Sequence, residues 1–377
     1  MNISILRIAA SLPLLLAVTA SIAQARFDTT NSVLTVPTID VDGQTYRDLA
    51  ARLDADGRLT ILALTAPTPP GGPDLATRAT AATATAQGHA LCQTIRPFYW
   101  EIGDAAQRLA GASIDAPGSL LHHDAGSVMP IASASKWLYG AYVAERRNGA
   151  PTEDDIRFLN FRSGYTSFAP NGCQAGDTVA SCVARDNNGV LTPAHVGRFS
   201  YGGGHMQKHA SLGAPGMALG ALDSAGLAVE MRRLLGTEIN FSFSQPQPAG
   251  GVRSTAADYA TFLRKLLKRQ LKLAHLLGSF AVCTNPASCA SALNTPVPSA
   301  LSWHYGLGYW IEDDPGGDGA FSSAGAFGFY PWIDADRRYY GVIARVAAAG
   351  GAGFDSAACG AMIRKAWSSG VVVTSVR

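Results

Sequence analysis

The order of helices and strands expected along residues 74–377 is the feature that most restricts the fold of this chain. Two strands follow a first helix, a region at about 150–250 mixes short helices with loops rich in Gly, Asn and Ser, and three strands and a last helix come after it. Strands grouped on either side of a helical stretch are typical of an α+β fold. We therefore predict a five-stranded antiparallel sheet flanked by helices, with a helical subdomain inserted. The expected helices lie at 74–92 and 356–367, and the expected strands at 98–102, 108–114, 305–311, 321–329 and 339–346.

The first 25 residues have the composition of a secretory signal peptide. Arg7 lies in a short basic region, an apolar run extends from Ala9 to Ala20, and Ala23-Gln24-Ala25 offers a small-residue cleavage site. We predict cleavage after Ala25 and a periplasmic or secreted mature protein. The apolar run is too short for a membrane span, so no span is expected.

Residues 26–65 are expected to form a small N-terminal β element, because β-rich runs alternate there with turns. The segment 66–73, Ala-Pro-Thr-Pro-Pro-Gly-Gly-Pro, has the composition of a linker to the main domain at 74–377. The β element carries no residues that suggest a chemical site. Docking against the main domain and dimerisation both stay open, and the oligomeric state is not determined.

The nearly neutral net charge argues against some classes of binding partner. Removing Arg7 with the signal peptide leaves 29 basic against 28 acidic residues. A chain so close to neutrality is not expected to bind nucleic acid or an anionic membrane surface.

Six cysteines in a chain predicted to be exported suggest disulfides. Cys173 and Cys182 lie nine residues apart in a loop rich in Gly, Asn and Asp, and Cys283 and Cys289 lie six apart around Asn285-Pro286. These are candidate local pairs, which leaves Cys92 and Cys359 as a long-range pair. Close pairs of ligands typical of zinc sites are absent from the sequence, so no metal is expected.

Ser133 and Lys136 are three residues apart where a helix is expected to begin, just after Pro130. Side chains at this spacing share one face of a helix. The lysine amine can then accept the serine proton, provided that its environment lowers its pKa from the usual value of about 10.4. The spacing alone fits a helix-capping serine and a solvated lysine equally well.

An ordered series of further motifs extends over roughly residues 75–370. The chain thereby resembles the serine β-lactamase and penicillin-binding protein superfamily, in particular its branch of class C β-lactamases, class VIII esterases, D-aminopeptidases and nylon-oligomer hydrolases. The resemblance implies the β-lactamase/transpeptidase-like fold. The motifs that carry it are Ser133-x-x-Lys136, Leu159–Tyr165, Phe199-Ser-Tyr-Gly-Gly-Gly204, Gly250-Gly-Val-Arg-Ser-Thr-Ala-Ala-Asp-Tyr259, Tyr305-Gly-Leu-Gly-Tyr309 and Ser323-Ala-Gly-Ala-Phe-Gly-Phe329.

The resemblance implies a role for each matching residue. Ser133 is the expected nucleophile, Lys136 its base and Tyr201 a second acid/base group, while the backbone N–H groups of Ser133 and Ala326 form the oxyanion hole. No metal or organic cofactor is expected. The expected substrate-binding residues are Tyr165, Gly203, Ser323 and Gly325.

Two positions depart from the family pattern. Gly203 replaces an amide that usually contacts the lysine and the substrate, and Ser323 replaces a cation that usually binds a substrate carboxylate. His205 either compensates for Gly203 or is an ordinary polar residue. We therefore expect a small-molecule or oligomeric ester or neutral amide as substrate. Two alternatives stay open: a D-Ala-type peptidase or β-lactamase acting on cell-wall peptides or β-lactams, and a catalytically decayed, penicillin-binding-like binding module.

Overall fold

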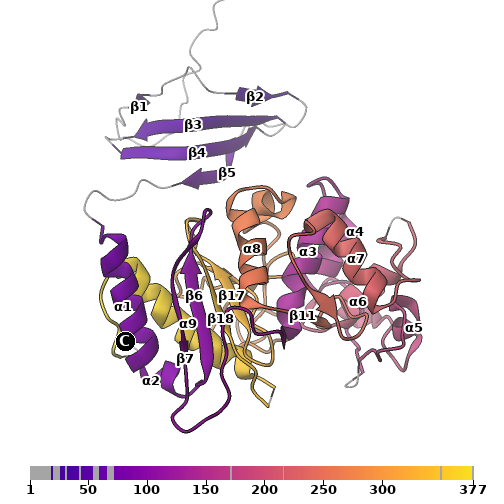
Figure 1. Cartoon of the computed structure of the whole chain (residues 1–377). Helices are drawn as coiled ribbons and strands as arrows, with labels where there is room; N and C mark the ends of the chain where they lie inside the picture. Colours follow the sequence, from indigo (N-terminus) through magenta and orange to yellow (C-terminus); the bar gives the residue numbers. More distant parts are fainter. Residues whose placement is uncertain are drawn as a thin grey trace, which may run out of the picture. The chain divides into compact units, whose positions relative to one another are not determined.

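The structure is a computed structural model of the 377-residue chain. It describes residues 18–19, 26–29, 32–41, 44–53, 59–65, 72–169, 172–214, 216–348 and 350–375. The chain divides into two compact units, Met1–Gly71 and Gly72–Arg377, and each is described by itself (Figure 1). Most of the predicted signal peptide and of the segment 66–73 lies outside the described residues.

The first unit is an antiparallel β-sheet. Its strands follow the order β1-β3-β4-β5, and β2 also pairs with β3 (Figure 1). β3 and β4 pair along their whole length, from Val33 opposite Arg52 to Val41 opposite Gln44. This sheet lies where the sequence predicts a small N-terminal β element at 26–65, and β1 lies before those bounds. The strands are β1 (Val18–Thr19), β2 (Arg26–Asp28), β3 (Val33–Val41), β4 (Gln44–Leu53) and β5 (Leu59–Thr65).

The second unit is built on an antiparallel sheet in the order β12-β14-β15-β16-β17-β18-β6-β7. β6 and β7 precede the helical insertion in the chain, and the other strands follow it. They join where β18 pairs with β6, from Tyr340 opposite Gly103 to Ala344 opposite Tyr99. The strands are β6 (Phe98–Gly103), β7 (Arg108–Ile114), β12 (Val282–Cys283), β14 (His304–Tyr305), β15 (Trp310–Ile311), β16 (Phe321–Ser322), β17 (Tyr330–Ile333) and β18 (Tyr340–Ala344).

Among the residues that the structure describes, the sheet has eight strands instead of the five expected. The single strand expected at 305–311 is the hairpin of β14 and β15, which reverses through Gly306 and Gly308. Gly308 has φ +93°, and a β-carbon on it would lie 2.4 Å from the backbone oxygen of Lys136. The strand expected at 321–329 ends after β16, and a turn leads into β17. These reversals are made by glycines inside apolar runs, where hydrophobicity alone does not show the change of direction.

Helices cover both faces of this sheet. α1 (Leu75–Gly88), α2 (Ala90–Gln93) and α9 (Ala352–Ser369) pack on one side, and α8 (Ala256–Leu267) packs on the other (Figure 1). α8 begins after Thr255, whose hydroxyl accepts from the backbone N–H of Asp258 at 3.0 Å. The helix expected at 74–92 is divided at His89, which caps α2 by accepting from the N–H of Leu91 at 3.2 Å. The mixed helix and sheet architecture confirms the predicted fold class.

In the chain, the helical subdomain follows β6 and β7 and precedes the remaining strands of the sheet. Within the described residues, none of the helices is both long and apolar enough to cross a membrane. The helices are α3 (Ser135–Arg146), α4 (Glu153–Leu159), α5 (Val179–Ala184), α6 (Gly204–Ser211) and α7 (Ser224–Leu235), with short 3₁₀ turns at Ala132–Ala134, Pro193–His195 and Lys272–Leu276. Short strands also pair here: β8 (Met129–Pro130), β10 (Ser242–Phe243) and β11 (Val252–Ser254), and β9 (Phe199–Ser200) with β13 (Ala292–Asn294).

Three disulfides join distant and local parts of the second unit. Cys92 of α2 bonds to Cys359 of α9, and the other pairs are Cys173–Cys182 and Cys283–Cys289. These are the three pairs considered from the sequence.

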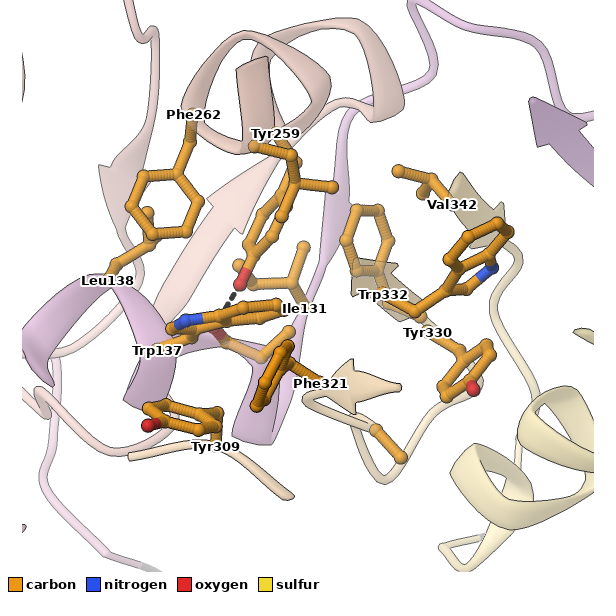
Figure 2. Packing of buried hydrophobic residues seen from close by; sticks show 14 of the residues in the cluster. Ile131, Trp137, Leu138, Tyr259, Phe262, Tyr309, Phe321, Tyr330, Trp332 and Val342 are labelled. Carbon is orange, nitrogen blue, oxygen red and sulfur yellow. Dashed lines mark hydrogen bonds between the residues drawn. The ribbon is translucent and has the colours of Figure 1, made fainter. Parts of the chain in front are cut away.

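A cluster of buried aromatic side chains packs around the start of α3. Trp137 is fully buried and packs on Tyr309, with ring centroids 5.8 Å apart, and against the edge of Phe262 (Figure 2). Tyr259 of α8 reaches into the same core and donates its hydroxyl to the backbone oxygen of Ala134 at 2.8 Å (Figure 2). Large buried side chains from α8 and from the β14–β15 turn therefore hold the beginning of α3 in place.

Candidate active site

Ser133 lies in the 3₁₀ turn Ala132–Ala134 that leads into α3. Lys136 follows three residues later in the first turn of α3, a spacing that brings the two side chains to the same face. Ala132 has φ +45°, an uncommon conformation for a residue with a β-carbon. Strain of this kind persists only where neighbours enforce it. Here Ile131 donates its N–H to the backbone oxygen of Val252 at 3.0 Å, and Tyr259 holds the turn from α8.

Lys136 and Ser133 are in hydrogen-bond contact. Lys136 Nζ donates to Ser133 Oγ at 3.0 Å and to the backbone oxygen of Ala249 at 2.7 Å. The Lys136 side chain is buried, and within the described residues it forms no ion pair. Burial therefore lowers the pKa of Lys136 to about 7. A substantial neutral fraction exists at neutral pH, and the neutral amine can accept the Ser133 proton.

Tyr201 lies next to both Lys136 and Ser133. The Lys136 ammonium is 5.0 Å from the centroid of the Tyr201 ring. This ring stacks on Trp310 and meets Phe161 and Tyr305 edge to face. Burial raises the pKa of the Tyr201 phenol well above its usual value, and a hydrogen bond with the Ser133 side chain opposes the shift only in part. Tyr201 is therefore a neutral phenol that can give a proton, and Lys136 is the readier base of the two.

His205 holds the residue before Tyr201. Its Nε2 donates to the backbone oxygen of Ser200 at 2.9 Å, and its Nδ1 accepts from the Ser163 hydroxyl at 2.7 Å. The ring is stacked on Phe161, with centroids 5.1 Å apart. Burial lowers the pKa of His205 to about 4, so the imidazole is neutral and keeps both hydrogen bonds. His205 thus positions the Tyr201 segment and does not supply the polar contact to Lys136 that Gly203 lacks.

The turn between β16 and β17 approaches the nucleophile turn closely. The Ser323 hydroxyl is buried and donates to the backbone oxygen of Ser133 at 3.1 Å. A β-carbon on Gly325 would lie 2.2 Å from the backbone oxygen of Ile131, so only glycine allows this approach. Ala326 is exposed at the tip of the turn, and its N–H has no acceptor in the part of the chain that the structure describes. Such a free N–H group is available to a ligand.

The Tyr165 ring lies in the packing of the helical subdomain. It stacks on Phe158 of α4 with centroids 5.7 Å apart, and Lys208 of α6 lies 5.3 Å from its centroid. The backbone at Tyr165 packs against the start of α6, since a β-carbon on Gly204 would lie 2.7 Å from the backbone oxygen of Tyr165.

Two features of the site were missed from the sequence. Ala249 provides the carbonyl that accepts from Lys136, and Gln247 lies close to Gly203. Both directly precede the Gly250-Gly251 motif, so the position next to that motif was the available signal. In the described part of the chain, no group of three or more His, Cys, Asp or Glu side chains could hold a metal ion.

Part of the chain matches a known protein family. The family model described as Beta-lactamase matches residues 166–352, which include Tyr201 and the Ser323–Phe329 motif. This match agrees with the resemblance to the serine β-lactamase and penicillin-binding protein superfamily that the sequence motifs carry. The match begins after Ser133 and Lys136, so the roles of these two residues rest on the geometry above. The family is one of hydrolases with the β-lactamase fold.

The chain is also similar to solved structures at low sequence identity. The octameric penicillin-binding protein homologue from Pyrococcus abyssi is 13% identical with a TM-score of 0.50, over 80% of this chain and 78% of that chain. A β-lactamase from Mycobacterium bovis is 15% identical with a TM-score of 0.47, over 72% and 96%. A D-stereospecific amidohydrolase from Streptomyces is 13% identical with a TM-score of 0.46, over 80% and 100%. A search of curated proteins found no match.

Proposed function

We propose that this protein is an exported serine hydrolase that forms an acyl-enzyme on Ser133 and releases the acyl group to water. The observation that carries the proposal is the contact of 3.0 Å between Lys136 Nζ and Ser133 Oγ, made by a lysine whose pKa burial lowers to about 7. A lysine that is merely solvated would keep its usual pKa of about 10.4 and stay protonated at neutral pH.

The mechanism uses three side chains and two backbone donors. Neutral Lys136 takes the Ser133 proton as Oγ bonds to the carbonyl carbon of the substrate. The N–H groups of Ser133 and Ala326 stabilise the negative oxygen of the tetrahedral intermediate. When the bond to the leaving group breaks, that group takes the proton of the Tyr201 phenol, and Lys136 returns a proton to Tyr201. Water then attacks the acyl-enzyme, with the same groups acting in reverse.

The proposed substrates are esters or neutral amides. Ser323 carries no charge, and its hydroxyl proton is directed to the backbone oxygen of Ser133. A substrate carboxylate would therefore gain no cation at this position. This argument disfavours D-Ala-type peptides and β-lactams, the second candidate class.

Export and domain organisation form part of the proposal. The three disulfides fit an oxidising compartment, so we propose a periplasmic or secreted protein cleaved after Ala25. The β element at 26–65 and the segment 66–73 would then precede the hydrolase domain at 74–377.

The test is hydrolysis of a panel of p-nitrophenyl esters and of nitrocefin by the mature protein and by Ser133→Ala. We expect ester turnover that Ser133→Ala abolishes, with the variant's melting temperature close to that of the wild type. Equal turnover by the variant would rule out the mechanism. Mass spectrometry after incubation with a fluorophosphonate separates the enzyme from a decayed binding module, because only the enzyme gains an adduct on the Ser133 peptide.

A further inference from the structure

Gln247 lies in the loop that provides the hydrogen-bond acceptor of Lys136. The backbone oxygen of Ala249, two residues after Gln247, accepts from Lys136 Nζ at 2.7 Å. The N–H groups of Gly250 and Gly251 both donate to the backbone oxygen of Gln247, at 3.1 and 2.8 Å. The Gln247 backbone is thus fixed by the same turn that positions the acceptor of the lysine.

The side chain of Gln247 is oriented by a neighbouring glutamine. Its Oε1 accepts from Gln245 Nε2 at 2.8 Å, which directs Gln247 Nε2 the other way. Nε2 lies 3.4 Å from the β-carbon position of Gly203 and 3.3 Å from that of Gly250. The residue is partly buried, and Nε2 has no acceptor among the residues that the structure describes. A partly buried amide donor without an acceptor is free to bind a ligand oxygen.

The backbone at Gly203 does not require glycine. Its φ of −77° and ψ of −23° lie in the right-handed helical region, which any residue adopts. A side chain there would instead run toward Gln247 Nε2 and the Phe168 ring, both 3.4 Å from its β-carbon. With glycine at position 203, two residues after Tyr201, the Gln247 amide is the polar side-chain group that lies beside this position.

We infer that Gln247 donates its side-chain amide to the acyl part of the substrate and favours acyl groups that carry a carbonyl acceptor beside the scissile bond, as N-acylated α-amino acyl groups do. The inference rests on the proposed acylation of Ser133. A neutral donor suits the neutral substrates proposed above, since it binds a carbonyl oxygen without requiring a carboxylate.

Two boronic acids of matched length test this preference. Ser133 Oγ gives a lone pair to boron in a new O–B bond, its proton passes to Lys136, and no bond to carbon breaks. Acetamidomethylboronic acid carries the carbonyl acceptor, and butylboronic acid lacks it. Gln247→Leu should raise the inhibition constant of the acetamido compound roughly 3-fold to 10-fold and leave that of the butyl compound within about twofold.

Gln270→Leu is the matched control, because Gln270 is exposed after the end of α8 and makes the same chemical change away from the site. It should leave both constants unchanged. Equal effects of Gln247→Leu on both boronic acids, or no effect on either, would overturn the inference while the adducts themselves still support the hydrolase. If the wild type forms no adduct with either boronic acid or with a fluorophosphonate, the proposed function fails and the inference fails with it.

Discussion

At the scale of single residues, the chemistry depends on the protonation of Lys136. Burial lowers its pKa to about 7, and acylation needs the neutral amine. The kcat/KM for an ester should therefore rise with pH and level off above about 7. Lys136→Arg keeps a permanent cation and should lower kcat/KM roughly 100-fold to 10,000-fold across the pH range. Steady-state ester hydrolysis between about pH 5 and pH 9 measures both effects, and a flat profile would contradict the assigned base.

The same pKa shift predicts how stability changes with pH. Between about 7 and 10.4 Lys136 is neutral in the folded protein and protonated in the unfolded chain, so the free energy of unfolding rises with pH there. Below about 7 the folded protein carries the buried charge at full cost. Lys136→Met removes this titration, so its gain in stability over the wild type should be largest below pH 7 and shrink toward pH 10. Urea unfolding at several pH values checks this, and a gain independent of pH would contradict it.

At the scale of elements, α3 is held in place by the turn between β14 and β15. Gly308 in this turn has φ +93°, and a β-carbon on it would lie 2.4 Å from the backbone oxygen of Lys136. Gly308→Ala should therefore lower the free energy of unfolding by roughly 2–3 kcal/mol, through backbone strain and the clash with α3. It should also reduce ester hydrolysis, because the clash would displace Lys136, whose amine is the proposed base.

Gly88 is the control for this prediction. It is the last residue of α1, and a β-carbon on it would meet no atom within 4 Å. Gly88→Ala should leave stability unchanged or raise it by up to about 1 kcal/mol. Urea unfolding compares the two variants, and a Gly308→Ala protein as stable as Gly88→Ala would show that the turn tolerates a side chain.

At the scale of the whole second unit, contacts between residues distant in sequence join its beginning to its end. β18 pairs with β6, and the Cys92–Cys359 disulfide joins α2 to α9 across a sequence separation of 267 residues. The Cys283–Cys289 disulfide closes a separation of only 6. Because the entropy that a cross-link removes from the unfolded chain grows with loop length, losing the first disulfide should cost about 3 kcal/mol more than losing the second.

The comparison uses the double variants Cys92→Ala/Cys359→Ala and Cys283→Ala/Cys289→Ala. Urea unfolding of each against the wild type gives the two losses. If the short-loop variant loses as much stability as the long-loop variant, loop closure is not the main contribution of the long-range disulfide.

Much of the fold follows from local signals. The strand expected at 98–102 is β6, the strand expected at 108–114 is β7, and Thr255 caps α8. Each of these depends on residues a few positions apart. The reversals at Gly308 and after Ser322 were not predicted, because they depend on where α3 and the nucleophile turn lie in space.

The candidate site divides in the same way. The spacing of Ser133 and Lys136 and the order of the motifs predicted the proposed nucleophile and its partner, since both signals lie in neighbouring residues. The contact of Ser323 with the Ser133 backbone, across 190 residues, was not accessible in the sequence. The role of His205 was also open until the fold placed it under Ser200 and beside Ser163.

The sequence by itself therefore determined the β-lactamase-like class of fold, the strands at 98–102 and 108–114 and the spacing of Ser133 and Lys136. Only the tertiary structure decided that Lys136 is buried, which lowers its pKa to about 7, and that the Gln247 amide lies beside Gly203. The physical reason is that hydrophobic period and capping act over a few residues, whereas desolvation and close approach depend on segments that meet only when the chain has folded.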